Sequence, residues 1–199
     1  MDIQLLNQSC IDCTKDTPPL ESTAIEAYLT SIDNTWNLSQ ATIQRTVLFD
    51  NYLAGLYYMT YIAAIAQQQG HHPDLLLSWN KVTITLTTHS IKQLTVNDFI
   101  IAAHCDNALT IALFNVVVSG TVQGVFYRKY CQKKALSLNL TGFVKNNSDK
   151  TVSVTVQGPI FLCHELIKWC YIGSPNSSVN AVDYKLMHSK QQYTTFLIK

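Results

Sequence analysis

The chain has 199 residues, of which 47% are hydrophobic and only 14% are charged, and its formal net charge is +1. This composition is typical of a packed globular protein and excludes an intrinsically disordered chain. No apolar run is long enough for a membrane-spanning helix, and the first residues lack the basic start and apolar core of a secretory signal. Six cysteines without the spacing of a disulfide framework favour a reducing, cytoplasmic setting.

Charge is distributed unevenly along the chain. Residues 1–112 contain four Lys or Arg against ten Asp or Glu, whereas residues 113–199 contain ten against three. A split of this kind predicts two modules with different ligands. The lysines of the basic half are scattered and form no aromatic-interleaved stripe of the kind that binds nucleic acid. We therefore expect small-molecule substrates, and neither nucleic acid nor a membrane as partner.

The first module is predicted to begin with a polar lead-in over residues 1–22. Cys10 and Cys13 stand there in a C-x-x-C spacing, but no further ligands at matched spacing accompany them, so we interpret them as ordinary thiols. A helix over 24–32, a strand over 43–49 and a helix over 51–69 follow. The last of these is apolar around most of its circumference, which predicts burial on more than one side. A second subunit would supply that cover, so we expect a homo-oligomer through this helix.

The stretch after this helix brings histidines to the ends of regular elements. Gly70 is suited to a left-handed helix terminus, and a proline three residues later prevents the helix from resuming. Residues 79–87 alternate apolar and polar side chains, which predicts a half-buried strand, and a helix capped by Thr95 follows. His71 and His72 then lie at the start of this stretch and His89 at its far end, where side chains face a cleft.

The spacing of Gln67, His71-His72-Pro73, Trp79, His89 and Asp98 resembles the pattern of the pterin-4a-carbinolamine dehydratase family. The resemblance implies dehydration of a 4a-hydroxytetrahydropterin, with the pterin as substrate and not as a bound cofactor, and assembly into dimers or tetramers. It implies that the catalytic residues are His71, His72 and His89, and that the substrate-binding residues include Gln67, Trp79, Thr87, Thr88 and Asp98.

Histidine suits this chemistry because its pKa lies near the working pH, so it can give and take protons. We expect His71 to carry out the acid–base step and Asp98 to orient an imidazole. Trp79 is expected to seal the core or to pack beside the pterin ring. Three histidines can also hold zinc, but adjacent histidines rarely aim at one ion, so no metal is expected. Many family members have Glu where this chain has Gln67, which predicts weaker pterin binding.

The second module is predicted as strand, helix, two strands, helix and strand, which is the order of a split ferredoxin-like unit. The strands are expected over 114–119, 140–146, 151–157 and 179–186, with a further strand over 193–198. The helices are expected over 127–138 and 159–171. Residues 147–150 are expected to form the turn between the two central strands.

A glycine-containing loop precedes the first helix of this module. Gly120 and Gly124 allow the backbone to curl, and successive N–H groups at a helix start can cradle an anion. Arg128 can add two hydrogen bonds to a phosphate. No Gly-Lys-Ser/Thr follows Gly124, so this is not a Walker loop. From the loop alone, a phosphate site and an ordinary turn remain open alternatives.

Residues 118–128 and 142–146 resemble the two signatures of the acylphosphatase family, and the similarity extends over 113–199. The resemblance implies that Arg128 binds the phosphoryl group and that Asn146 positions the attacking water. It implies substrate binding by the rest of the loop, namely Gly120, Gln123, Gly124, Val125, Phe126 and Tyr127. An acyl phosphate has a good leaving group, its carboxylate, so its hydrolysis requires no cofactor.

These observations predict an α+β protein of two domains, 1–110 and 111–199. The first would be an antiparallel sheet with helices on one face, and the second a ferredoxin-like βαββαβ sandwich. The predicted function is bifunctional: a 4a-hydroxytetrahydrobiopterin dehydratase that serves an aromatic amino acid hydroxylase, and an acylphosphatase. The alternative is that the pterin domain is a non-catalytic dimerisation or binding module and that the acylphosphatase is the only working enzyme.

Overall fold

A computed structural model of the chain describes residues 3–189 and 191–199. The chain divides into two compact units, Met1–Leu109 and Thr110–Lys199. None of the helices in the described residues combines the length and the apolar character that spanning a bilayer requires.

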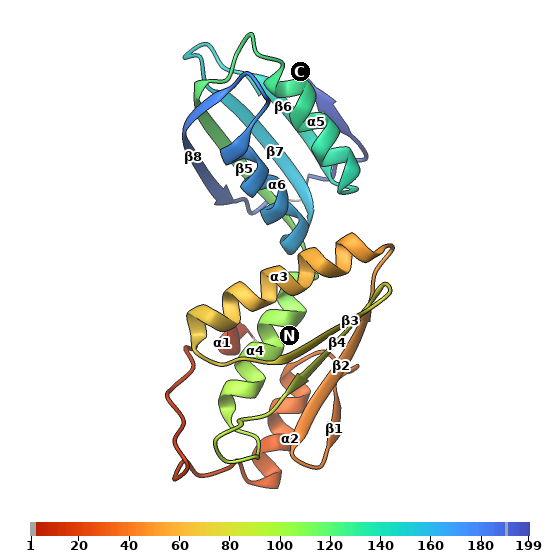
Figure 1. The fold of residues 1–199 in the computed structure, drawn as a ribbon, viewed down its shortest axis with the longest axis vertical. Helices are drawn as coiled ribbons and strands as arrows, with labels where there is room; N and C mark the ends of the chain where they lie inside the picture. The colour runs from red at the N-terminus through yellow and green to blue at the C-terminus, as the bar shows by residue number, and fades with distance from the viewer. Residues whose placement is uncertain (1–2, 190) are drawn as a thin grey trace. The chain divides into compact units, whose positions relative to one another are not determined.

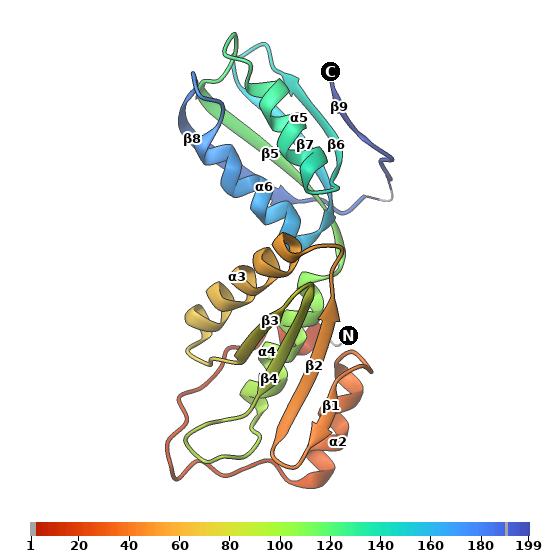
Figure 2. The same ribbon diagram turned by 45° about the vertical axis from the view of Figure 1, so that its right-hand side comes forward.

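The N-terminal unit contains a four-stranded antiparallel sheet in the order β1-β2-β4-β3 (Figure 1). Helices α3 and α4 pack against each other and against β4, on the same face of the sheet (Figure 2). The predicted antiparallel sheet with helices on one face is thus confirmed. The strands are β1 Asn37–Ser39, β2 Thr42–Leu48, β3 Asp74–Ser78 and β4 Lys81–Leu86, and the helices are α1 Ile3–Leu6, α2 Ser22–Ser31, α3 Tyr52–Gln69 and α4 Val96–Ala108.

Both ends of α3 follow from local chemistry. The Asn51 side chain accepts a hydrogen bond from the Ala54 N–H at 2.9 Å and so caps the first turn. At the other end Gly70 adopts a left-handed conformation with φ of 66°, and the His71 N–H bonds to the Ala66 carbonyl at 3.2 Å. The helix therefore ends where the sequence predicts, and it delivers His71 directly after its last turn.

The core of the N-terminal unit lies between the sheet and the two long helices. Every second residue of β4 is fully buried, as the alternation predicts, and Tyr58 of α3 is fully buried beside them. The Tyr58 hydroxyl donates to the Cys105 carbonyl at 3.0 Å, which joins α3 to α4 without leaving a polar group unpaired. The largest fully buried side chains here include Ile43, Ile62, Ile84, Leu86, Phe99, Ile100 and Ile101.

The prediction that Trp79 seals the core is wrong, because its side chain is exposed. Residues 74–78 form β3, which the sequence analysis missed because three successive leucines hide the alternation. Trp79 and Asn80 then make the tight turn between β3 and β4, and Trp79 has a φ of 56°. A side chain at such a turn points away from both strands, and Trp79 is 81% exposed.

The C-terminal unit contains a five-stranded sheet in the order β8-β5-β7-β6-β9, with α5 and α6 side by side over one face (Figures 1 and 2). The first four strands and two helices have the predicted order and the predicted ferredoxin-like arrangement. β9 adds a fifth strand, parallel to β6. The strands are β5 Ile111–Thr121, β6 Thr141–Asn146, β7 Val152–Pro159, β8 Ser178–Leu186 and β9 Phe196–Ile198, and the helices are α5 Tyr127–Ser137 and α6 Ile160–Ile172.

Gly120 serves the sheet at the end of β5. The pairing of β5 with β8 shifts register between Ser119 and Gly120, where Gly120 has a φ of 122°. A Cβ atom at this position would lie 2.2 Å from the Ser178 carbonyl oxygen. Only glycine therefore fits this β-bulge, and the bulge turns the chain into the loop that precedes α5.

Candidate active sites

The first site is centred on His71 and the buried carboxylate of Asp98. The His71 Nε2 atom lies 2.8 Å from Asp98 Oδ1, and the two residues are 8% and 0% exposed. His71 follows the C-terminus of α3, whereas Asp98 lies in the first turn of α4. The packing of the two helices therefore brings together two residues that are 27 positions apart in the chain.

Asp98 also accepts hydrogen bonds from two threonines through its second oxygen. The Thr88 hydroxyl and the Thr95 backbone N–H each lie 2.8 Å from Oδ2. Thr95 is the residue that caps α4, and an acidic side chain in the first turn also interacts favourably with the helix dipole. Asp98 is thus a carboxylate with three donors, which fixes its rotamer.

This arrangement fixes the orientation of the His71 imidazole. A carboxylate only accepts hydrogen bonds, so the bond to Asp98 places a proton on Nε2. The other ring nitrogen, Nδ1, is then the atom available to exchange a proton with a ligand. Of the three histidines singled out in the sequence, His71 alone has a buried carboxylate partner among the described residues.

The other two predicted histidines of this site and Gln67 are exposed, and Thr87 is bonded within the protein. His72 and Gln67 are exposed, and His72 Nε2 lies 3.2 Å from Gln67 Oε1, so this pair is together on the surface beside His71. His89 is exposed and directly follows the buried Thr88, shortly after the end of β4. The Thr87 hydroxyl donates to the Ala41 carbonyl at 2.9 Å, which occupies its proton within the sheet.

The lead-in is attached to the same end of the unit, which the sequence analysis did not predict. The Cys10 N–H donates to Gln69 Oε1 at 2.8 Å, and the Asn97 side chain exchanges hydrogen bonds with the backbone of Ile11 at 3.1 and 2.8 Å. Burial, with smaller contributions from Asp98 and Cys13, raises the pKa of the Cys10 thiol to about 12. A thiol with this pKa is protonated and unreactive at neutral pH, in line with the interpretation of an ordinary thiol.

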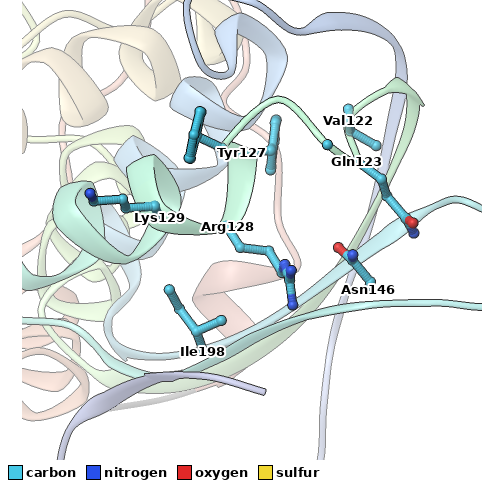
Figure 3. Close-up of a pocket in the computed structure, with 9 residues that line it drawn as sticks. Val122, Gln123, Tyr127, Arg128, Lys129, Asn146 and Ile198 are labelled. Carbon is cyan, nitrogen blue, oxygen red and sulfur yellow. The ribbon is translucent and has the colours of Figure 1, made fainter.

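The second site is a hollow of about 270 Å³ at the N-terminus of α5 (Figure 3). The Tyr130 N–H is the first in α5 to reach a backbone carbonyl, that of Phe126 at 3.1 Å. The N–H groups of the preceding helical residues therefore have no acceptor within the helix. The hollow is lined by Val122, Gln123, Gly124, Phe126, Tyr127, Arg128, Lys129, Asn146 and Ile198.

Arg128 and Asn146 converge on this hollow from different elements. Arg128 extends from the first turn of α5, and Asn146 is the last residue of β6; Figure 3 shows their polar ends pointing toward one another. The Arg128 guanidinium donates from Nη1 to the Lys199 carbonyl at 3.1 Å, which holds it while its other N–H groups remain for a ligand. The two predicted catalytic residues are thus brought together.

The side chains of Gln123 and Tyr127, two residues predicted to bind substrate, make hydrogen bonds within the protein. Gln123 Nε2 donates at 2.9 Å to each of the carbonyls of Asn147 and Thr151, and so ties the loop to the turn that follows Asn146. The Tyr127 side chain is 1% exposed, and its hydroxyl donates to the Cys170 carbonyl at 2.8 Å. Tyr127 therefore offers a ligand only its backbone N–H.

The other predicted loop residues shape the backbone. The carbonyl of Val125 accepts a hydrogen bond from the Ser174 hydroxyl at 2.8 Å, which anchors the loop to the segment after α6. Gly124 has a φ of 77°, and a Cβ atom there would meet no atom within 4 Å. Phe126 also has a positive φ, 61°, and its side chain is 67% exposed. Gly120 lies in the β-bulge, so its role is in the sheet.

Three lining residues, Val122, Lys129 and Ile198, were missed by the sequence analysis. Lys129 follows Arg128 directly and could have been found from the basic run at the start of the helix. Ile198 comes from β9, and its approach depends on the parallel pairing of β9 with β6, for which the sequence carries no local signal.

Comparison with known proteins assigns each unit to a family. The model of the family described as pterin 4 alpha carbinolamine dehydratase matches residues 18–108, and that of acylphosphatase matches residues 114–198. A protein of Alkaliphilus metalliredigens named "Putative pterin-4-alpha-carbinolamine dehydratase" is 41% identical over 103 residues, which are 51% of this chain and 93% of the relative.

Solved structures of both kinds are also similar. An acylphosphatase from Coxiella burnetii is 35% identical, with 45% of this chain and 93% of the other covered and a TM-score of 0.43. A transcriptional coactivator/pterin dehydratase from Brucella melitensis is 26% identical, with 44% and 95% covered and a TM-score of 0.42. The chain belongs to the pterin-4a-carbinolamine dehydratase family through its N-terminal unit, and a match to the acylphosphatase family model over residues 114–198 follows in tandem.

Proposed function

We propose that the protein is a bifunctional enzyme that dehydrates a 4a-hydroxytetrahydropterin in its N-terminal unit and hydrolyses acyl phosphates in its C-terminal unit. The observation that carries most weight is the convergence of Arg128 and Asn146 on one hollow at the N-terminus of α5. For the pterin reaction, the support is the pairing of His71 with a buried carboxylate.

Acyl-phosphate hydrolysis needs charge neutralisation and an oriented water. Arg128 and the free N–H groups at the start of α5 would bind the phosphoryl oxygens, and the Asn146 side chain would hold the attacking water. The water oxygen forms a bond to phosphorus, the bond from phosphorus to the acyl oxygen breaks, and the carboxylate leaves with that electron pair. The proton of the water passes to a phosphate oxygen, so the reaction requires no separate base.

Pterin dehydration needs a proton for the leaving hydroxyl and an acceptor for the proton on N5. The bond from C4a to oxygen breaks, a double bond forms between C4a and N5, and water leaves. His71, oriented by Asp98, would exchange one of these protons through Nδ1. His72 and His89 would assist on the exposed side. The product would be the quinonoid dihydropterin, which suggests service to an aromatic amino acid hydroxylase.

The C-terminal reaction is tested with Arg128→Gln and a matched change of charge in the same unit, Lys185→Gln, at an exposed position of β8. Arg128→Gln should lower the rate of benzoyl phosphate hydrolysis by about 100-fold or more, because it removes a donor to the transition state. Lys185→Gln should leave the rate as it is. Equal rates in the wild type and Arg128→Gln would refute the proposed role of this hollow.

The N-terminal reaction is tested by measuring dehydration in the wild type beside Gln67→Glu and His71→Ala. We expect activity in the wild type, tighter pterin binding in Gln67→Glu because of its charged acceptor, and a loss of about 100-fold in His71→Ala. Activity only in Gln67→Glu would mean that the wild-type unit does not catalyse the reaction.

The second candidate for the N-terminal unit is a non-catalytic dimerisation or binding module. One observation favours an assembly role: α3 buries one side in its own unit but leaves Tyr52, Leu53 and Leu56 between 40% and 55% exposed. We expect a homo-oligomer through this side of α3 in either case. Sedimentation of wild type and Leu56→Glu tests this, since a charge there should dissociate the oligomer.

A further inference from the structure

A second hollow lies beside the proposed phosphoryl site, along the first turns of α5. It has a volume of about 320 Å³ and is lined by Phe126, Lys129, Tyr130 and Lys133. Phe126 and Lys129 also line the first hollow, so the two share a wall. Figure 3 shows Lys129 extending away from the Arg128 guanidinium, on the opposite side of the first helical turn.

The four lining residues form one face of the helix start. Positions 126 and 130 are four residues apart, as are positions 129 and 133, and positions 130 and 133 are three apart. Side chains at these spacings are neighbours on the helix surface. Lys133 is five residues beyond Arg128, so their backbones are about 7.5 Å apart along the helix axis and about 140° apart around it. The two hollows meet at Phe126 and Lys129, so a ligand bound at Arg128 would enter the second hollow across this shared wall.

The lysines on this face, Lys129 and Lys133, have no ionic partner among the residues that the structure describes. Helix α5 contains Arg128, Lys129, Lys133 and Lys134 and no acidic residue. Lys134 lies 3.4 Å from Glu165, whereas neither Lys129 nor Lys133 takes part in an ion pair within residues 3–189 and 191–199. Two ammonium groups therefore face solvent beside a site that is itself suited to an anion.

Two aromatic side chains line the same hollow as these charges. Phe126 is 67% exposed and Tyr130 is 42% exposed. Phe126 also holds a left-handed backbone conformation that only glycine adopts freely. An acyl group lying over these rings would be covered on one side by apolar surface and would end near an ammonium group.

We propose that this second hollow is the acyl-group subsite of the acylphosphatase site, and that it selects acyl phosphates whose acyl group carries a second negative charge. The proposal rests on the function proposed for the C-terminal unit and specifies its substrate class. The phosphoryl end binds at Arg128, the carbon skeleton packs against Phe126 and Tyr130, and the distal anion binds at Lys129 and Lys133.

The test compares benzoyl phosphate with para-carboxybenzoyl phosphate, a pair that differs by one carboxylate at the far end of a rigid ring. The full-length wild type should have a higher kcat/KM for the carboxylated substrate at low ionic strength, and added salt should reduce this preference. Lys133→Gln should lower kcat/KM about fivefold more for the carboxylated substrate than for benzoyl phosphate. Comparing each variant with the wild type on the same substrate removes the difference in intrinsic reactivity.

Lys185→Gln is the control, because it removes a lysine from the same unit outside both hollows. It should leave the ratio of the two kcat/KM values unchanged. Benzoyl phosphate hydrolysis without any preference for the carboxylated substrate, or equal effects of Lys133→Gln on both, would overturn the subsite while leaving the acylphosphatase function intact. Failure of the wild type to hydrolyse either substrate would overturn both.

Discussion

Asp98 is the residue on which the geometry of the pterin-side site depends. It is fully buried and receives hydrogen bonds from His71, Thr88 and the Thr95 backbone, so a change there alters both the packing of α4 and the orientation of the imidazole. The buried charge remains stable because each of its partners is a donor. In the proposed reaction Asp98 would position His71, and it would need no contact with the pterin.

Asp98→Asn should therefore act on stability and on chemistry together. We expect the free energy of unfolding to fall by about 1–3 kcal/mol, because an amide nitrogen would face a donor. Dehydration should fall by about 100-fold. Nitrogen NMR of His71 should show that the proton no longer resides mainly on Nε2. Asp50→Asn, at an exposed position, is the control; a normal rate with an altered His71 spectrum would contradict the positioning role.

Gln123 has a similar positioning role in the C-terminal unit. Its amide holds the carbonyls on either side of the turn that follows Asn146. Gln123→Leu should lower kcat for acyl phosphates about tenfold through misplacement of Asn146. The inhibition constant of inorganic phosphate should change little, because Arg128 is untouched. Equal losses in kcat and in phosphate binding would indicate a general disruption of the loop.

At the scale of elements, the β6–β7 turn carries avoidable strain. Lys150 occupies this turn with a φ of 69°, a conformation that glycine adopts without a steric penalty. Asp149 holds the turn in place by accepting from the backbone N–H and the hydroxyl of Thr151 at 3.0 and 2.6 Å. The strain is therefore confined to one residue.

Lys150→Gly should raise the free energy of unfolding of the C-terminal unit by about 0.5–1 kcal/mol. Urea unfolding of the full chain, followed by a probe in this unit, measures the change. Lys145→Gly is a suitable contrast, since this exposed residue lies within β6 and glycine should weaken the strand. Destabilisation by Lys150→Gly would contradict the assignment of strain.

Helix α4 contains a histidine, His104, that should make the stability of the N-terminal unit depend on pH. The His104 Nε2 atom is buried and has no hydrogen-bond partner among the described residues, and burial lowers the pKa of this imidazole below 6.5. The unfolded chain binds a proton near pH 6.5, whereas the folded chain does so only at lower pH. Stability contributed by neutral His104 is therefore lost as the pH falls through about 6.5 toward the folded pKa.

His104→Leu should make the N-terminal unit less sensitive to acid. Unfolding midpoints in urea at about pH 7.5 and about pH 5.5 should differ less in this variant than in the wild type. His188→Leu, at an exposed position outside this unit, should retain the wild-type difference. An unchanged difference in His104→Leu would show that other groups carry the pH dependence.

Local patterns in the sequence predicted most helices and strands but not the contacts between segments that are far apart in the chain. The ends of α3, the alternation of β4 and the cap of α4 were correct because each depends on a few neighbouring residues. β3 was missed because three leucines in a row carry no alternation, and Trp79 was misplaced as a result. The contact between His71 and Asp98, the attachment of the lead-in to Gln69 and Asn97, and the approach of Ile198 all depend on tertiary packing.

At the scale of the whole molecule, the uneven distribution of charged residues follows the division into two units. Most of the acidic residues belong to the unit that carries the proposed pterin site, whereas α5, whose first turn lines the proposed phosphoryl site, contains four basic residues. Each unit contains its own core and its own candidate residues. We therefore expect the two activities to be separable, with no residue shared between them.

The most direct test of this central claim is a crossed assay of wild type, His71→Ala and Arg128→Gln, in which both activities are measured for each protein. We expect the wild type to have both activities. His71→Ala should lose dehydration and keep acyl-phosphate hydrolysis, and Arg128→Gln should show the reverse. Loss of both activities in either variant, or a folded wild type that lacks one of them, would contradict this claim.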